Sequence, residues 1–287
     1  MKSSFKKDGP AAGVDHFLRL VSDWSHFGPP LRPSAADTRI IAQVAARLAP
    51  HSRVVILGVT PETAACGWHP TTRLLAVDHS VAMISALWEG EGAPESAKAV
   101  AAAWAAMPLR SGSAHAIVGD GCYNMFPYPG GFRDLTREID RVLGPGGRLA
   151  MRVFVRPEPD ESLKSVERDF RAGRIRSVHA LKVRLWAAVQ GPSSSGVCLG
   201  EVWEAWRRLP MIDSVAEGGP GWSIEEIAGM EAYRSLSSRY FLSTAAEFQS
   251  VLLERFERVE CFWTDGELSE RCPTFVAYKA ASPEAHP

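Results

Sequence analysis

Short, continuous apolar runs recur through the first half of the chain. Arg53–Gly58, Arg73–Asp78 and Ala114–Val118 carry no polar alternation, which is typical of strands buried on both faces of a sheet. We predict two further strands in this half, at Lys98–Ala102 and Arg148–Val155. Each run is followed by glycine, an acid or a loop, so the chain leaves the sheet at a definite point.

Segments with helical spacing lie between these runs. The apolar residues of Phe132–Leu143 fall on one helical face, and glycines flanking Pro145 stop this segment. Ser80–Trp88 also predicts a helix. Strands that alternate with helices in this way predict βαβ crossovers and a parallel sheet. Two alternating segments close the chain, Phe256–Trp263 and Thr274–Ala280, and we expect them to form an antiparallel pair.

The pattern divides the chain into three parts. Residues 1–50 form a helical preface, 51–156 together with 256–280 form the α/β core, and 157–255 form a mostly helical insert. The preface predicts one helix over Asp15–Trp24 and a second that Ser34 or Asp37 caps and that ends near Leu48.

Composition and charge exclude several classes of protein. The chain has 287 residues, with 32 basic and 33 acidic side chains, so no global field attracts nucleic acid or an anionic membrane. The longest apolar run, Ala99–Met107, falls far short of the ~20 residues of a membrane span. The five cysteines form no CxxC pair, so we expect no metal site and a reducing, cytoplasmic compartment. The basic amino terminus has no apolar stretch behind it, so we expect no signal peptide.

Candidate chemistry lies at the carboxyl ends of the strands, where open α/β sheets bind ligands. Asp78 follows the second strand, twenty positions after Gly58, which is the separation at which an acid meets a nucleotide ribose. A carboxylate suits this task because it accepts two hydrogen bonds at once. The alternative is that Asp78 is a helix N-cap.

Two segments make the chain recognisable. Residues 115–154, HAIVGDGCYNMFPYPGGFRDLTREIDRVLGPGGRLAMRVF, and residues 101–120, AAAWAAMPLRSGSAHAIVGD, resemble the fourth-strand region and the adenine-side loop of class I S-adenosylmethionine-dependent methyltransferases. The resemblance covers about 50–155 and agrees with the strand pair in 256–280. It implies a Rossmann-like, doubly wound α/β sheet of seven strands, mostly parallel with an antiparallel last strand.

The resemblance also implies a site for S-adenosylmethionine, whose product is S-adenosylhomocysteine. It assigns cofactor binding to Gly58, Val59, Thr60, Asp78, His79, Ala103, Trp104, Asp120 and Gly121. Two positions depart from the family pattern. The stretch from Val59 to Glu62 stands where the family has further glycines, and Ala103 stands where an adenine acceptor is usual.

The altered loop has two compatible interpretations. The Thr60 hydroxyl and the Glu62 carboxylate can replace the missing backbone contacts to the methionyl group. Alternatively, Thr60 and Pro61 simply open a helix as its N-cap and first residue.

Candidate catalytic residues follow the fourth strand. They are Asp120, Tyr123 and Asn124, with His79 as a further candidate base, and Tyr123 has a packing or turn role as its alternative. A stretch of the insert contains basic residues and no acid, and is either a solvated face or a dock for an anion. Its members are Arg171, Arg174, Arg176, Lys182 and Arg184.

Our first hypothesis is a methyltransferase that acts on a small-molecule acceptor, with neither a membrane nor nucleic acid as partner. Homo-oligomerisation stays open. The alternative is a non-catalytic methyltransferase-like scaffold that binds a ligand or protein. A nicotinamide oxidoreductase is a third hypothesis, and it lacks the usual glycine fingerprint.

Overall fold

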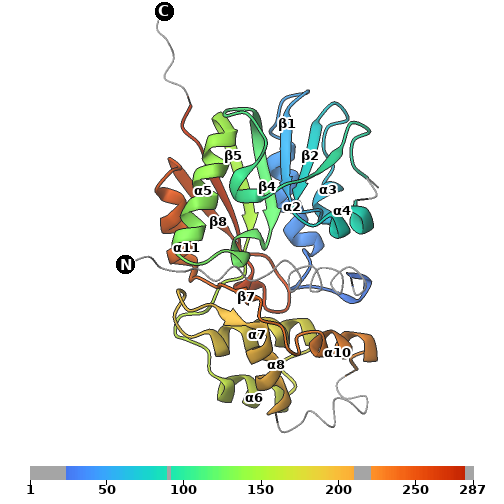
Figure 1. The fold of residues 1–287 in the computed structure, drawn as a ribbon, viewed down its shortest axis with the longest axis vertical. Helices are drawn as coiled ribbons and strands as arrows, with labels where there is room; N and C mark the ends of the chain where they lie inside the picture. Colours follow the sequence, from blue (N-terminus) through green and yellow to red (C-terminus); the bar gives the residue numbers. More distant parts are fainter. Residues whose placement is uncertain (1–23, 89–91, 210–220, 282–287) are drawn as a thin grey trace, which may run out of the picture.

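The architecture is organised around one seven-stranded sheet (Figure 1). The computed structural model describes residues 24–88, 92–209 and 221–281, so most of the helix expected over 15–24 lies outside the described residues. The strand order is β3-β2-β1-β4-β5-β9-β8. The strands are β1 (Arg53–Leu57), β2 (Arg73–Asp78), β3 (Lys98–Ala101), β4 (Ala114–Asp120), β5 (Leu143–Arg152), β8 (Arg258–Phe262) and β9 (Thr274–Tyr278).

Only β9 runs against its neighbours within this sheet. It pairs antiparallel with β5 on one side and with β8 on the other, whereas β1 to β5 pair in parallel. This confirms the expected mostly parallel sheet with its antiparallel strand. Both bounds of β5 differ from the expected Arg148–Val155, because the strand begins at Leu143, which pairs with Ala114 before a register shift, and ends at Arg152. The glycines that flank Pro145, which we expected to stop the preceding helix, therefore lie within β5.

Both faces of the sheet are covered, which explains the unbroken apolar runs. Val55 and Leu57 of β1 point into one core, and Val54 and Ile56 point into the other. The first core is closed by α5 (Gly130–Val142) and α11 (Ala245–Leu253). The second is closed by α2 (Ala35–Ala45), α3 (Pro61–Ala64) and α4 (Val81–Leu87). Although α11 lies within the range expected for the insert, it packs on the sheet.

The preface helix α2 begins where the sequence predicts. Ser34 is its N-cap and accepts a hydrogen bond from the Asp37 amide, while the Asp37 carboxylate accepts one from the Ser34 amide. This capping box satisfies two backbone donors at the helix start. Ser34 and Asp37, the two expected capping residues, therefore both take part, Ser34 as the N-cap and Asp37 within the first turn.

The remainder of the insert forms its own apolar cluster below the carboxyl edge of the sheet (Figure 1). Its elements are α6 (Leu163–Arg171), α7 (Val178–Gln190), β6 (Val197–Cys198), α8 (Leu199–Arg207), α10 (Ile224–Glu231) and β7 (Arg239–Tyr240). Helix α7 is buried on most sides, so it lies at the centre of this cluster. No helix in the described ranges is long and apolar enough to span a membrane.

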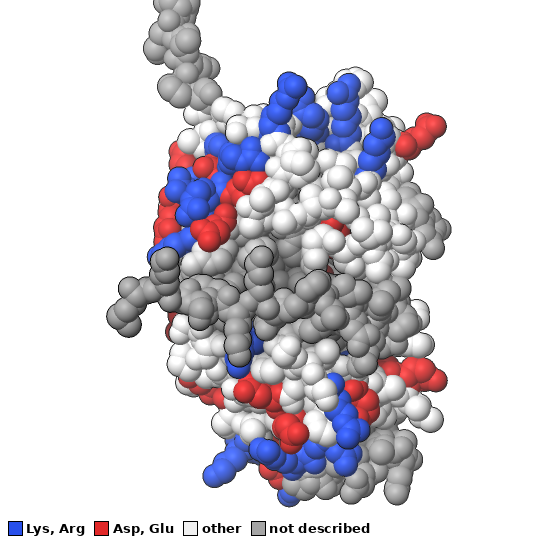
Figure 2. Space-filling model, viewed as in Figure 1, with Lys and Arg blue, Asp and Glu red and all other residues white. Residues whose placement is uncertain are grey.

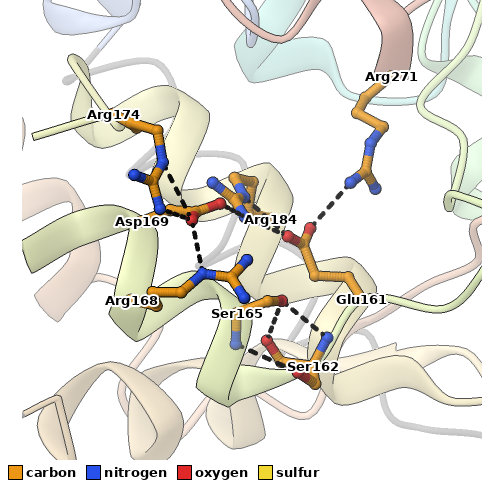
Figure 3. A network of polar contacts seen from close by, with 8 residues as sticks. All are labelled: Glu161, Ser162, Ser165, Arg168, Asp169, Arg174, Arg184 and Arg271. Atoms are coloured by element: carbon orange, nitrogen blue, oxygen red, sulfur yellow. Dashed lines mark hydrogen bonds and ion pairs between the residues drawn. The ribbon is translucent and has the colours of Figure 1, made fainter. Parts of the chain in front are cut away.

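Arg174 and Arg184 of the basic stretch pair with acids that precede it (Figure 3). Arg184 pairs with Glu161 at 2.5 Å and with Asp169 at 2.7 Å, and Arg174 also pairs with Asp169. Hydrogen bonds from these two arginines hold the pKa of Asp169 well below its usual range. Acidic and basic groups are accordingly interspersed over this end of the molecule (Figure 2). The anion dock considered from sequence is therefore not supported.

Lys182, the one fully buried member of that stretch, has a different environment. Its ammonium lies 5.1 Å from the Phe27 ring centroid and 5.5 Å from that of Tyr233. Contact with ring faces stabilises a cation that has left water. Lys182 therefore links the insert to the preface rather than facing solvent.

Replacing Arg184 with Met tests the buried pair. Glu161 and Arg184 have side chains only 4% and 12% exposed, and Arg271 still pairs with Glu161 in the variant. We expect the free energy of unfolding to fall by about 3 kcal/mol, as is usual when a buried pair loses one partner. Arg174→Met is the matched control, since that side chain is 55% exposed and should contribute about 0–1 kcal/mol. Equal losses in urea denaturation would contradict this assignment.

Candidate functional site

A cavity lies at the carboxyl edge of the sheet, where the strand order reverses between β1 and β4. Its empty volume is about 1020 Å³, the space open to solvent at its mouth included. Preface, strand ends and insert all contribute to its wall. The residues used below are Trp24, Phe27, Arg32, Gly58, Val59, Thr60, Asp78, Met83, Leu87, Trp104, Asp120, Gly121, Asn124, Phe154, Trp186, Tyr233 and Tyr240.

Gly58 forms the turn that ends β1. Its φ of +91° is a conformation that favours glycine. A Cβ added to it would lie 3.9 Å from each of Asp78 Oδ2, Thr60 Oγ1 and Trp104 Cζ2. These three groups therefore surround the open side of the glycine, and the backbone there is accessible to a ligand.

The altered loop opens a short helix, as one of its two interpretations expects. Thr60 is the N-cap of α3 and Pro61 is its first residue, but the Thr60 hydroxyl makes no capping hydrogen bond. Thr60 instead lines the cavity together with Val59. The Glu62 carboxylate is engaged by Arg32 of the preface, whose Nε donates to Oε1 at 2.6 Å.

Asp78 ends β2 and is only 5% exposed. Its Oδ1 accepts a hydrogen bond from the Ser80 amide at 2.8 Å. Burial raises the pKa of this carboxyl, against the amides of Ser80 and His79 and the His79 ring, which lower it. The N-cap of α4 is Ser80, whose hydroxyl accepts from the Met83 amide. The N-cap alternative for Asp78 is therefore wrong, and its Oδ2 faces the Gly58 turn.

Trp104 forms the apolar wall beside Asp78, with Met83 and Leu87. Its Nε1 donates to the Val77 carbonyl at 2.5 Å, which fixes the indole against β2. Two other predicted residues do not reach the cavity wall. Ala103 is exposed, and the His79 side chain is 47% exposed with its ring edge-on to Trp104.

Asp120 ends β4 and faces a buried arginine. Its Oδ1 lies 3.2 Å from Nε of Arg152, whose side chain is 1% exposed. Burial raises the pKa of Asp120 to about 6, Arg152 opposes this shift, and Asp37 and Glu62 add to it. Asp120 thus exchanges a proton near neutral pH. Gly121 follows at a φ of +67°, where a Cβ would lie 3.2 Å from the Phe154 ring.

The catalytic assignment of Tyr123 is not supported by its position. Tyr123 is fully buried, and its hydroxyl lies 2.9 Å from Thr136 Oγ1. Its ring packs edge-on against Phe132 and Phe248, and burial raises its pKa. A tyrosine inside the helix–sheet core cannot meet a substrate. The packing alternative describes this residue.

Asn124 reaches the cavity wall, but both N–H groups of its amide are already donated. Its Nδ2 donates to the carbonyls of Phe154 and Phe241 at 2.8 and 2.9 Å. Its Oδ1 accepts from the Phe154 amide at 2.9 Å. Asn124 therefore ties the end of β5 to the chain beside β7, which corrects its assignment as a catalytic residue.

Several residues of the wall were not assigned from sequence. The preface supplies Trp24, Phe27 and Arg32, and the insert supplies Trp186, Tyr233 and Tyr240. The aromatic content of the insert was a visible signal for the second group. Within the described ranges, no group of three or more His, Cys, Asp or Glu side chains is placed to hold a metal ion.

Comparison with known proteins supports the fold. No protein-family model matches the chain, and a search of curated proteins finds no match. Among solved structures, one from Rhodobacter sphaeroides described as a putative Zn-dependent alcohol dehydrogenase gives a TM-score of 0.59 at 15% identity, over 93% of this chain and 98% of that one. The CurJ carbon methyltransferase gives 0.57 at 13% identity, over 93% of this chain and 61% of that one.

A putative O-methyltransferase from Nostoc punctiforme gives a TM-score of 0.52 at 10% identity, over 96% of this chain and 63% of that one. This chain thus spans less than two thirds of both methyltransferase structures. The antiparallel β9 between β5 and β8 departs from the six parallel strands usual in dinucleotide-binding sheets. The chain has the Rossmann-like fold of class I S-adenosylmethionine-dependent methyltransferases.

Replacing Asn124 with Ala tests its structural role. The variant leaves the buried Phe154 amide and two carbonyls without their partner, and we expect the free energy of unfolding to fall by about 2–4 kcal/mol. Tyr123→Phe is the control, because it removes a single hydroxyl contact and should cost about 1 kcal/mol. A fully stable Asn124→Ala protein in guanidinium denaturation would refute this role.

Asp120→Asn tests the raised pKa of Asp120. Between its ordinary value of 3.8 and about 6, the folded wild type holds a proton that the unfolded chain has released. Wild-type stability therefore falls as pH rises through this window. The variant has no such loss, so its free energy of unfolding relative to wild type should rise by up to about 3 kcal/mol from pH 4 to 7.

The loss of the Asp120 charge beside Arg152 adds only a constant offset to this comparison, because arginine stays charged throughout the range. Chemical denaturation at several pH values measures the difference. A difference that stays flat between pH 4 and 7 would show that Asp120 titrates at its ordinary pKa.

Proposed function

We propose that the protein is an S-adenosylmethionine-dependent methyltransferase that acts on a small-molecule acceptor. The observation that carries this proposal is the buried Asp78 carboxylate, whose Oδ2 faces the Gly58 turn beside Trp104. In a sheet of this order, such an acid is suited to bind the two hydroxyls of a ribose.

The residues present fit this cofactor. Asp78 would accept hydrogen bonds from the ribose, and Trp104, Met83 and Leu87 would hold the adenine between apolar surfaces. The methionyl group would follow Gly58 towards Thr60, where the glycine leaves the backbone open. When bound, S-adenosylmethionine supplies a methyl group on a positively charged sulfur.

Asp120 is suited to act as the general base. It borders the cavity, and its pKa of about 6 lets it accept a proton from a hydroxyl or amine at neutral pH. Arg152 would orient this carboxylate, since its Nε lies 3.2 Å from Asp120 Oδ1. Positioning of the acceptor supplies the rest of the acceleration.

An aromatic wall would hold the acceptor and exclude water. Phe154 and Trp186 meet edge-on at 5.4 Å, and Trp186 meets Tyr240 in the same way at 5.2 Å. These rings line the side of the cavity that the insert covers. The concave shape and the apolar wall favour a small molecule over a protein or nucleic acid.

A second candidate is a methyltransferase-like scaffold that binds a ligand or partner without transferring a methyl group. The altered loop favours it, because Pro61 has no amide donor and Glu62 already pairs with Arg32. A nicotinamide oxidoreductase is the third candidate. The name of the Rhodobacter sphaeroides structure favours it, whereas the reversed β9 and the single glycine of the loop do not.

Calorimetric titration distinguishes these candidates. We expect S-adenosylmethionine and S-adenosylhomocysteine to bind and NAD(P) not to bind. If the folded protein binds neither S-adenosylmethionine nor S-adenosylhomocysteine at millimolar concentration, the methyltransferase proposal is wrong. Binding without transfer to any acceptor would favour the scaffold.

Asp78→Ala should weaken the binding of S-adenosylhomocysteine. Loss of hydrogen bonds to a charged group costs about 1.5–3 kcal/mol, or about 10- to 100-fold in the dissociation constant. Ser80→Ala is the matched control, because it removes the cap of α4 and leaves the Ser80 amide that binds Asp78. The ribose assignment fails if the two variants bind the nucleoside equally well.

A further inference from the structure

One edge of the seven-stranded sheet is formed by β8, which pairs with β9 on one side only (Figure 1). Within the described residues, no strand lies along its other side. An edge strand leaves half of its backbone amides and carbonyls without a ladder partner, so it can take up a further strand. The first residue of β8 is exposed and the next four are half-buried. The edge is therefore accessible.

One face of β8 borders an open hollow. Arg258, Glu260 and Phe262 line this hollow from the strand, and α2 borders it from the opposite side. Its empty volume is about 1130 Å³, the space open to solvent included. The hollow thus separates α2 from the edge strand, and the side chains on this face of β8 can be reached from outside.

Two opposite charges stand next to each other on this face. Arg258 Nη1 lies 2.9 Å from Glu260 Oε1, and the two side chains are 60% and 35% exposed. The guanidinium also stacks over the Tyr278 ring, 3.9 Å from its centroid, and the Tyr278 hydroxyl donates to Glu260 Oε2 at 2.9 Å. An exposed pair of this kind contributes little to stability by itself. Its contacts with Tyr278 do hold both charges at the edge.

A second copy of β8, antiparallel to the first and centred on Val259, meets these charges in complementary order. In that register Arg258 of each copy lies opposite Glu260 of the other, because positions equally far from the centre face each other. Each charge then has opposite charges both along its strand and across the pair. Registers centred on Arg258 or on Glu260 would instead place like charges directly opposite each other, which destabilises a sheet.

Exposed apolar side chains lie at both ends of this edge. Leu253, the last residue of α11, precedes β8 and is 49% exposed, while Trp263 follows the strand and is 51% exposed. Antiparallel pairing brings the start of each strand beside the end of the other. Leu253 of one copy and Trp263 of the other thus approach each other on both sides of the twofold axis, and their burial favours association.

The opposite edge of the sheet lacks this complementarity. Strand β3 carries the exposed Lys98 and no acidic residue. Lysine on an edge strand discourages pairing with another edge. Between the two edges, the charge pattern therefore favours β8.

We propose that β8 binds β8 of a second copy of this chain as an antiparallel pair centred on Val259. The two sheets then continue into each other across a twofold axis, and the same surface serves both copies. Neither β8 nor its flanking residues Leu253 and Trp263 line the cavity at the strand ends. The inference therefore does not depend on the proposed function.

Sedimentation velocity with two charge reversals tests this pairing. We expect the wild type to form dimers at about 50 µM. Arg258→Glu and Glu260→Arg should each weaken dimerisation by at least about tenfold, because each places like charges opposite each other. A one-to-one mixture of the two variants should form heterodimers again, since one strand is then acidic and the other basic.

Two controls separate the interface from folding. Lys98→Glu reverses an exposed charge at the start of the other edge strand and should leave the dimer unchanged. Hydrogen exchange of the wild type needs no variant. The amides of β8 should exchange more slowly at about 50 µM than at about 0.5 µM, because pairing gives its outer amides an acceptor.

The outcomes decide the inference in either direction. A wild type that stays monomeric overturns it, and so does a dimer that both charge reversals leave intact. It is also overturned if the two folded variants stay monomeric when mixed, or if exchange in β8 does not depend on concentration. Association restored in the mixture, together with slowed exchange in β8, supports it. If either variant fails to fold, the exchange measurement on the wild type decides alone.

Discussion

The site depends on one buried cation. Arg152 is 1% exposed, and a charge in that position is tolerable only when it is paired and hydrogen-bonded. It donates from both Nη atoms to the Pro30 carbonyl at 3.0 and 2.7 Å, and it faces Asp120 across 3.2 Å. Asp37 of α2 lies 3.9 Å away. The guanidinium therefore joins preface and sheet behind Asp120, which lines the cavity.

The polarity of the cavity follows from this arrangement. Arg152 only partly offsets the burial of Asp120, so the pKa of this carboxyl stays raised to about 6. Asp78 ends β2, which β1 separates from β4, and it also has a raised pKa because it is buried. Aromatic rings line the same cavity. Acidic groups and apolar rings together suit a ligand that is partly cationic and partly planar.

Local pattern was sufficient to predict the strands of the seven-stranded sheet and the strand-end acids, but not β6 and β7. The uninterrupted apolar run of β1 predicts a strand that is buried on both faces. The spacing from Gly58 identifies Asp78 as the strand-end acid. Both inferences depend only on residues close in sequence. The direction of the Tyr123 side chain depends instead on the turn after β4, which points it into the core. The pairing of Arg32 with Glu62 joins positions 30 residues apart. No periodicity encodes such a contact.

The reversed strand has a mechanical effect on the insert. Because β9 runs antiparallel, its first residue, Thr274, pairs with Arg152, and the preceding Arg271 reaches Glu161 at 3.1 Å. The amides of Val153 and Val155 also donate to the carbonyls of Pro273 and Arg271. The chain leaving β5 is thus clamped by a segment more than 100 residues later. A swing of the insert about its entry strand would have to break this clamp.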